Sequence, residues 1–389
     1  MFRKTIAVFL VFMMLFASAC KSSDYRNGTE TNDGGDGGSG QTGTQTETQT
    51  ETQTETQTET RTESKEPELN VTKTRAQELE EKLYTFEYGR ILSIEMPYTW
   101  EIYIGGNASA LMIYLCDPED PTFQVFYLIS ADGELKNQKA RDFYLNAGAY
   151  SMDIPLNETG TVEEMFIDFH EITDAAVRFN PEHYATTFPY FKNFTSVEQW
   201  DLDDYYSQSA IEDKMIHATF TDGVTGEMGE GLFCAAITNG EVLTYPGYDI
   251  GTYHFFNIAC ISAPYGMMEE YYPVLQRMLG SLKFTPGFLK QLSGQQLDDA
   301  IDVSLLNPLI EDTARVMGDI WETGREIYKI QAQEWSDDKQ GYERYYDNET
   351  GLIYRVKKGV MDGYNGDRYR KIDKGSDFYA RAVDGYVDR

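Results

Sequence analysis

A four-residue repeat near the start of the chain limits where a folded domain can begin. Threonine occupies every even position from Thr42 to Thr62, and glutamate recurs at every fourth residue from Glu47 to Glu63. The repeat and the glycine-rich stretch before it have no apolar side chains whose burial could offset the entropy of ordering. We therefore predict that residues 21–74 form an unfolded tether, with an end-to-end distance of about 40 Å as a flexible coil.

The first twenty residues have the pattern of an export signal. Arg3 and Lys4 precede an apolar run of eleven residues, 6–16, and the segment ends in Ala17-Ser18-Ala19-Cys20. The run is too short to span a bilayer, which takes about 20 apolar residues. The segment resembles the bacterial lipoprotein signal, in which the cysteine that follows small residues becomes the lipidated N-terminus. The resemblance implies that Cys20 carries a lipid and holds the protein on the outer face of the cytoplasmic membrane, in an extracytoplasmic location.

The charge composition of the chain argues against two classes of binding partner. Residues 71–334 contain 16 basic and 42 acidic residues, which is a net charge of −26 out of −31 for the whole chain. A surface this acidic repels phosphate backbones and anionic lipid headgroups, so we expect no nucleic-acid partner and no electrostatic docking on the membrane. The 28 tyrosines and the aromatic content of 14% favour a folded body rich in β-structure.

Residues 75–287 alternate between strand-like and helix-like segments, which predicts an α+β domain. The capping box that starts at Thr161 predicts one helix, and residues 135–148 and 267–279 predict two more. Asp222-Gly223 and Asn239-Gly240 favour tight hairpin connections. The expected strands are 86–96, 101–105, 111–116, 123–129, 184–194, 214–221, 231–238, 251–262 and 281–285.

Residues 288–389 have a different character. A helix is predicted from Pro308 to residue 334, with a buried seam of Thr313, Met317, Ile320, Gly324 and Ile327. Threonine and glycine in this seam favour packing on the chain's own domain over a coiled coil with a partner. Residues 341–346 and 352–356 are expected to form a hairpin, with further short strands around Tyr369 and Tyr386.

Three cysteines remain once Cys20 is assigned to the lipid. Cys116, Cys234 and Cys260 all lie in strand-like runs, where a free cysteine is usually a small buried hydrophobic residue. We predict buried thiols. If any pair forms a disulfide, Cys234 with Cys260 is the candidate, because their runs could be neighbouring strands.

The sequence contains no motif of a known catalytic or metal site, so no catalytic, cofactor-binding or metal-binding residue is assigned. His217 and His254 lie in strand-like runs and could face each other, although a core position is the simpler interpretation of each. The acidic clusters Asp201, Asp203, Asp204 and Glu163, Glu164, Asp168 are expected by chance among 64 acidic residues. An envelope hydrolase that uses carboxylates or His217 and His254 is the alternative hypothesis.

Tyrosine and arginine gather in the charge-balanced C-terminal part, and both residue types are favoured at binding hot spots. They form a candidate partner surface. The alternative, which we favour, is that the tyrosines fill the face of a small sheet against the preceding helix, with the arginines stacked outside. The candidate residues are Tyr342, Arg344, Tyr345, Tyr346, Tyr354 and Arg355.

Several segments resemble a group of uncharacterised surface lipoproteins of Gram-positive bacteria. These are Tyr114-Leu-Cys-Asp-Pro118, Gln124-Val-Phe-Tyr127, Asn137-Gln-Lys-Ala-Arg-Asp142 and the run from Gly341 to Arg355. More loosely, residues 84–287 resemble the PsbP-like family, through Met96-Pro-Tyr-Thr-Trp100 and a closing helix that leads into Ser281-Leu-Lys-Phe-Thr285.

The second resemblance implies an antiparallel-sheet α/β/α sandwich and an accessory or assembly role. We therefore hypothesise a non-catalytic, lipid-anchored binding or accessory module, with a protein or a cell-envelope glycan as its partner.

Overall fold

The computed structural model describes residues 68–107, 110–146, 154–184, 186–202, 210–240, 244–245, 248–293 and 303–388. Cys20, the export signal and residues 21–67 lie outside these ranges. Residues 64–389 form one compact unit, so the regions before and after residue 287 belong together. Within the described ranges, no helix is long and apolar enough to cross a membrane.

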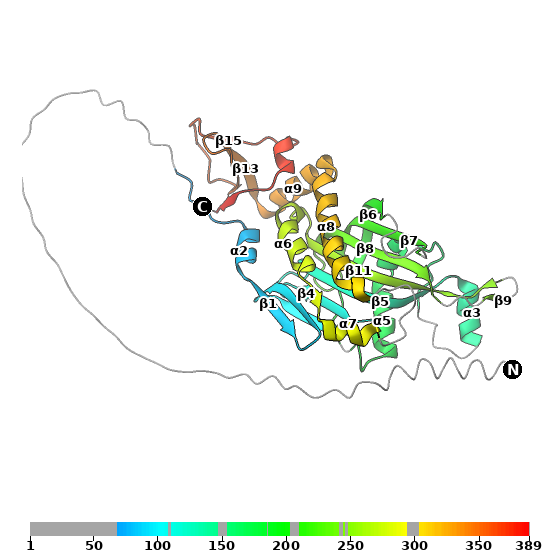
Figure 1. Ribbon diagram of the computed structural model, residues 1–389. Coiled ribbons are helices and arrows are strands. Elements are labelled where there is room, and N and C mark those ends of the chain that lie inside the picture. Colours follow the sequence, from blue (N-terminus) through cyan, green and yellow to red (C-terminus); the bar gives the residue numbers. More distant parts are fainter. Residues whose placement is uncertain are drawn as a thin grey trace, which may run out of the picture. The chain divides into compact units, whose positions relative to one another are not determined.

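A seven-stranded sheet organises the fold (Figure 1), and every neighbouring pair in it is antiparallel. In spatial order its strands are β3 (Glu101–Gly105), β4 (Met112–Cys116), β5 (Gln124–Leu135), β11 (Thr252–Pro264), β8 (Met228–Asn239), β7 (Glu212–Asp222) and β6 (Phe191–Asp201). Of the seven strands of this sheet, β11 comes last in the sequence, yet it lies in the middle of the sheet. Because both of its faces are buried, its apolar residues do not alternate with polar ones.

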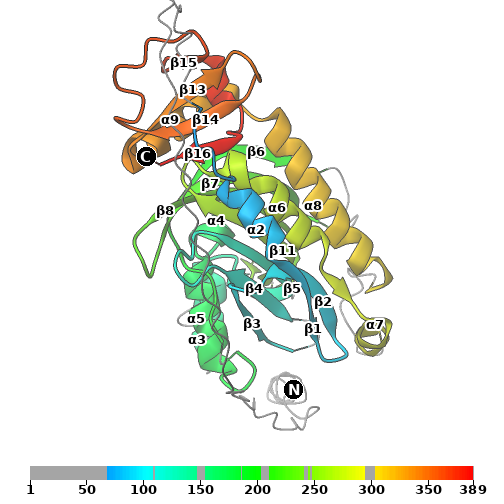
Figure 2. The ribbon, with the colours of Figure 1, turned by 90° about the vertical axis from the view of Figure 1, so that its left-hand side faces the viewer.

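Helices cover both faces of this sheet (Figure 2). On one face lie α6 (Met268–Gly280) and α8 (Leu306–Thr323), and on the other α4 (Val162–Ile167) and α5 (Phe169–Phe179). The pleat of β8 directs Leu232 into the first core and Phe233 into the second. The prediction of an α+β fold with an antiparallel sheet is confirmed.

Smaller elements surround the main sheet. A second sheet consists of β1 (Leu83–Tyr88), β2 (Leu92–Pro97) and β12 (Lys283–Phe284), and a third of β9 (Thr244–Tyr245) and β10 (Tyr248–Asp249). The C-terminal sheet has the order β15 (Tyr369–Lys371), β13 (Tyr342–Asp347), β14 (Ile353–Lys357), β16 (Gly385–Val387). The other helices are α2 (Arg75–Glu81), α3 (Gln138–Asn146), α7 (Pro286–Ser293), α9 (Glu326–Gln340) and the 3-10 turns Val303–Leu305 and Asp377–Ala380.

Three predictions in the sheet region are wrong. The single strand expected over 86–96 is a hairpin, in which β1 and β2 pair with each other as antiparallel strands. The strand predicted over 184–194 begins at Phe191 and continues to Asp201. Pro189 has no backbone N–H to donate, and β6 is an edge strand with two register shifts, so its second half needs no apolar alternation. In addition, Asn239-Gly240 does not close a tight hairpin, because β9 and β10 lie between β8 and β11.

The single helix predicted from Pro308 to residue 334 is also wrong, because it is two helices. Gly324 has an extended backbone (φ −64°, ψ 172°) that ends α8, and α9 starts at Glu326. The buried stripe of α8 contains Thr313 and Met317 as expected, but Ile327 is 72% exposed. Any residue can adopt these extended angles, but glycine is a poor helix former, and the helix breaks at the glycine that fitted the seam.

The folded part starts before Arg75, the residue expected to follow the tether. Thr72 pairs with Tyr386 of β16, and the Thr74 side chain caps α2 in a capping box with Gln77. Residues 68–74 therefore contact the body of the protein.

The prediction of buried thiols is confirmed, because Cys116, Cys234 and Cys260 are free and buried. Cys234 and Cys260 lie on neighbouring strands, but they belong to the cores on opposite faces of the sheet. A disulfide between them is excluded by this geometry.

Candidate functional site

The two histidines of the hydrolase hypothesis do not meet. His217 of β7 pairs with Leu232, whereas His254 of β11 pairs with Thr238, and β8 lies between their strands. His217 is buried against the rings of Trp321 and Tyr328, with centroids at 5.2 and 4.7 Å. Burial, together with the Lys329 cation, lowers the pKa of His217 to about 3. An imidazole with this pKa is too weak a base for proton transfer at neutral pH.

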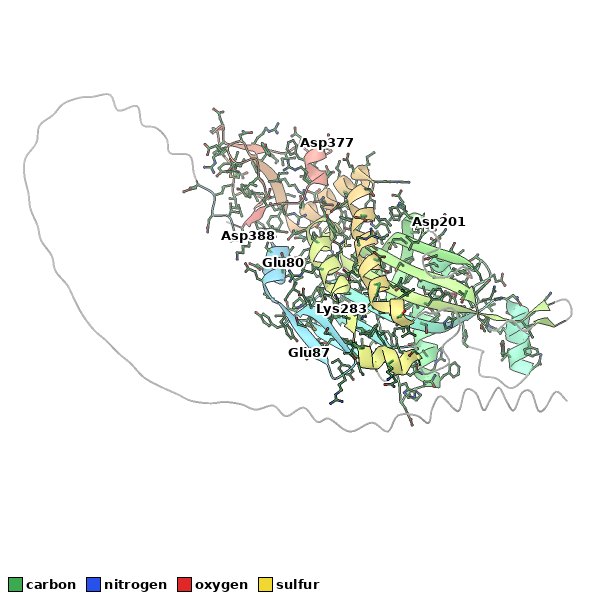
Figure 3. The ribbon with its side chains drawn as sticks, in the orientation of Figure 1. Glu80, Glu87, Asp201, Lys283, Asp377 and Asp388 are labelled. Carbon is green, nitrogen blue, oxygen red and sulfur yellow. The ribbon has the colours of Figure 1, made fainter. Side chains whose placement is uncertain are left out.

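The acidic clusters do not converge on one buried site, because Glu163, Glu164 and Asp168 are half-buried. Asp201 is exposed at the end of β6 (Figure 3), and Asp203 and Asp204 lie outside the described residues. Glu163 accepts a hydrogen bond from Gln199 (2.8 Å). Burial raises the pKa of Asp168 to about 6. In the part of the chain that the structure describes, no group of three or more His, Cys, Asp or Glu side chains could hold a metal ion.

The Tyr–Arg set does not form an accessible surface. Arg344 and Arg355 are 0% and 1% exposed, and Tyr342, Tyr345 and Tyr354 are also buried. Tyr346 is half-buried with its ring against Phe378. The favoured alternative is correct only in part. Tyr342 packs against α9, but Tyr345 and Tyr354 fill the opposite face of the sheet, and the arginines expected to stack outside are buried.

Asp337 of α9 is the anion that makes the burial of both arginines possible. Its Oδ2 lies 2.7 Å from Arg344 Nε, and its Oδ1 lies 2.6 Å from Arg355 Nε. Arg344 also donates to the side-chain oxygen of Gln333 and to the carbonyl of Arg381. A buried charge needs such partners, because desolvation costs several kcal/mol per ion.

The same network joins the C-terminal sheet to the helices beside the main sheet. Arg355 Nη1 donates to the Tyr386 hydroxyl (2.8 Å), which in turn donates to Glu270 Oε2 of α6 (2.7 Å). Glu270 Oε1 accepts from the backbone N–H of Ala76 in α2 (3.3 Å). The network is therefore structural, and the arginines that suggested a binding site hold the C-terminal sheet in place.

A row of aromatic side chains follows the α8–α9 break and reaches the surface. It runs from Trp321 and His217 to Tyr328, whose ring centroid is 6.3 Å from that of Tyr265. Tyr265 in turn contacts Trp335 at 4.9 Å, with the rings 77° apart. Edge-to-face contacts of this kind add to the stabilisation from area burial.

The exposed end of this row is the candidate site. Trp335 is 39% exposed on α9, and the Lys339 ammonium lies 5.2 Å from its ring centre. Lys339 also pairs with Glu227 (2.8 Å), and the neighbouring Met228, also exposed, accepts a backbone hydrogen bond from Tyr265. We refer to Glu227, Met228, Tyr265, Trp335 and Lys339 as the Trp335 surface.

Buried hydrogen bonds support the loop beneath the Trp335 surface. Glu230 of β8 accepts from the backbone N–H groups of Gly266 (2.9 Å) and Met268 (3.2 Å), and from the Tyr328 hydroxyl (3.0 Å). Burial raises the pKa of Glu230 to about 7. Gly266 has a φ of +79°, and a Cβ there would lie 2.2 Å from the Ala332 carbonyl oxygen. The loop that carries Tyr265 thus lies directly against α9.

The buried end of the row offers no room for a substrate. The cavity beside His217 and Trp321 has a volume of about 10 Å³, which is enough for about one water molecule. Sites for small molecules are typically some 300–1,000 Å³. Within this row of aromatic side chains, a partner can therefore make contact at the exposed end, around Trp335.

The sequence matches no model of a known protein family and no curated protein. The Trp335 surface was not foreseen from the sequence, because Met228, Tyr265 and Trp335 come from three segments that no local pattern connects.

Proposed function

We propose that the protein is a non-catalytic, lipid-anchored binding module on the outer face of the cytoplasmic membrane, and that it contacts a protein partner of the cell envelope through the Trp335 surface. The observation that carries the proposal is an exposed tryptophan and methionine on a hydrogen-bonded support, next to the Lys339–Glu227 ion pair. Tryptophan and methionine are enriched at protein interfaces, and charged residues form the rim of such interfaces.

We extend the proposal to kinship with the Gram-positive surface lipoproteins and with PsbP-like domains. Helices on both faces of an antiparallel sheet, and the helix α6 that leads into β12, support it. The alternative, an envelope hydrolase, loses support because His217 and His254 lie on non-neighbouring strands.

The first test concerns the anchor. Replacing Cys20 with serine should abolish incorporation of fatty acid into the protein, because the thiol is the only atom at that position that can carry the lipid. Metabolic labelling with a fatty acid, followed by capture of the protein, measures this. Label retained by Cys20→Ser would rule out Cys20 as the attachment site.

The second test concerns the Trp335 surface. Trp335→Ala should weaken capture of the partner about thirtyfold, since an interface hot spot is worth about 2 kcal/mol. Its melting temperature should stay within a few degrees of the wild type, because the indole is partly exposed. The measurement is cross-linking of the mature protein to its own cell envelope, with quantification of the captured protein.

Tyr98→Ala is the matched control, because this aromatic side chain is 68% exposed on a different element. It should leave capture unchanged. Equal capture by Trp335→Ala and the wild type would refute the proposed surface. Binding to purified, protein-free envelope glycan that Trp335→Ala abolishes would replace the protein partner with a glycan.

A further inference from the structure

The thiols in the described part of the chain are shielded from water. Cys116, Cys234 and Cys260 are all buried. Burial raises the pKa of the Cys116 thiol to about 11, and it likewise raises the pKa of Cys234 and that of Cys260. Because the thiolate is the form that an oxidant attacks, these three cysteines are poor targets for oxidation at neutral pH.

One thioether, in contrast, is open to solvent. Within the described ranges, the methionines divide into nine buried side chains and one exposed side chain, that of Met228. Met228 is 40% exposed, whereas the next most accessible of these methionines, Met361, is only 8% exposed. Among the sulfur atoms that the structure describes, the thioether of Met228 is therefore the one that a dissolved oxidant reaches most readily.

The backbone of Met228 is held in the sheet although its side chain is exposed. β8 is buried from Gly229 to Thr238, and Met228 is its exposed first residue. Met228 pairs with Thr221 of β7, and its carbonyl oxygen accepts a hydrogen bond from the Tyr265 N–H (3.0 Å). A chemical change at the thioether therefore alters the surface and leaves the strand paired.

Met228 is also part of the Trp335 surface. The adjacent Glu227 pairs with Lys339 (2.8 Å), and the Lys339 ammonium lies 5.2 Å from the ring centre of Trp335. A thioether is apolar and adapts its shape to a partner, whereas a sulfoxide is polar. The sulfoxide oxygen would have to lose its water when a partner covers it. Oxidation at this position therefore weakens an apolar contact.

We propose that Met228 is a modification site, at which hydrogen peroxide converts the thioether to methionine sulfoxide and thereby weakens binding at the Trp335 surface. In this reaction the O–O bond of the peroxide breaks, an S–O bond forms, and the other oxygen leaves with both hydrogens as water. Sulfur loses two electrons and the peroxide gains them. The effect on binding rests on the proposed function, and the extracytoplasmic location proposed there is an oxidising compartment.

The first measurement is chemical and needs no partner. The mature full chain is treated with hydrogen peroxide, and peptide mass spectrometry follows the gain of one oxygen at each methionine. Met228 should be oxidised at least tenfold faster than Met361, because the Met361 thioether is buried. Equal rates at the two methionines would overturn the modification site.

The second measurement is capture of the partner from the cell envelope, after the peroxide has been removed. Oxidation should lower capture by the wild type at least fivefold, and methionine sulfoxide reductases with a dithiol should restore it. Met228→Leu should capture the same amount before and after treatment, because leucine has no sulfur to oxidise. Met361→Leu is the control, and it should lose capture on treatment as the wild type does.

The outcomes separate this inference from the proposed function. If Trp335→Ala loses capture but the oxidised wild type does not, the effect of oxidation on binding is overturned and the Trp335 surface stands. If neither change lowers capture, the proposed function fails and the effect on binding fails with it, whereas the oxidation rates still decide the modification site. A loss of capture by oxidised Met228→Leu equal to that of the wild type would overturn the role of Met228.

Discussion

Replacing Asp337 with alanine is expected to lower the free energy of unfolding by about 3–5 kcal/mol, because it leaves two buried guanidinium groups without their shared carboxylate. Asp337 contacts Arg344 at 2.7 Å and Arg355 at 2.6 Å, and neither arginine is more than 1% exposed. A water molecule in the space left by the carboxylate would carry no charge to balance the two guanidinium cations. Urea unfolding at neutral pH, followed by tyrosine fluorescence and far-UV circular dichroism, measures the change.

The neighbouring residue provides the control. Asp338 is also in an ion-pair cluster, with Lys358 (3.3 Å) and Lys374, but its side chain is 47% exposed. Asp338→Ala should therefore cost less than about 1 kcal/mol, as exposed pairs generally do. If Asp337→Ala and Asp338→Ala lowered the free energy of unfolding by similar amounts, the burial of the Asp337 network would not explain its contribution to stability.

Elements whose signals are local could be predicted from the sequence. β3 has the expected bounds, the hairpin of β13 and β14 is found at the expected residues, and Thr161 caps α4 as its capping box indicated. In each case the deciding contacts lie within a few residues of one another. A pattern of single residues is sufficient for such elements.

The burial of the arginines could not be predicted, because it depends on contacts between distant segments. Arg355 is stabilised by Asp337 on the preceding helix and by Glu270, which is 85 residues away in sequence. From the sequence alone, an arginine among tyrosines indicates either a hot spot or, as we favoured, a stacked surface side chain, and neither of these is a buried ion pair. The central position of β11 could not be predicted for the same reason, because it depends on pairing with β5 and β8.

The candidate site was missed for a related reason. Its rings belong to the loop after β11 and to α9. The helix α9 exists as a separate element because the chain breaks at Gly324. The seam spacing continued through this glycine, so the sequence favoured one straight helix. Only tertiary packing decides between a straight and a broken helix when both bury an apolar stripe.

Two buried carboxyl groups should make the protein less stable as the pH rises towards 8. Glu134 is fully buried and accepts a hydrogen bond from Asn157 (2.6 Å), and burial raises its pKa to about 8. Burial likewise raises the pKa of Glu230 to about 7. A raised folded-state pKa means that the folded protein binds more protons than the unfolded chain, so this stability is lost as the pH rises through the folded pKa.

Between pH 6 and 8 the loss should be about 4 kcal/mol, because Glu134 holds its extra proton over about two pH units and Glu230 over about one, and each unit is worth about 1.4 kcal/mol. His217 contributes in the opposite direction, because its pKa is lowered to about 3 in the folded state from the usual value of 6.5. This contribution fades over about one pH unit above 6.5, so the carboxyl groups dominate the slope in the window from about pH 7 to 8.

Glu134→Gln imitates the protonated side chain, so it should remove more than half of this slope and make the variant more stable than the wild type at pH 8. Urea unfolding across the window measures the slope, and Glu78→Gln in the exposed part of α2 should leave it unchanged. If Glu134→Gln kept the wild-type slope, the proton lost above pH 7 would have to come from another group, with Glu230→Gln as the next variant to compare. The two substitutions should act additively, because Glu134 and Glu230 lie in different parts of the structure and share no hydrogen-bond partner.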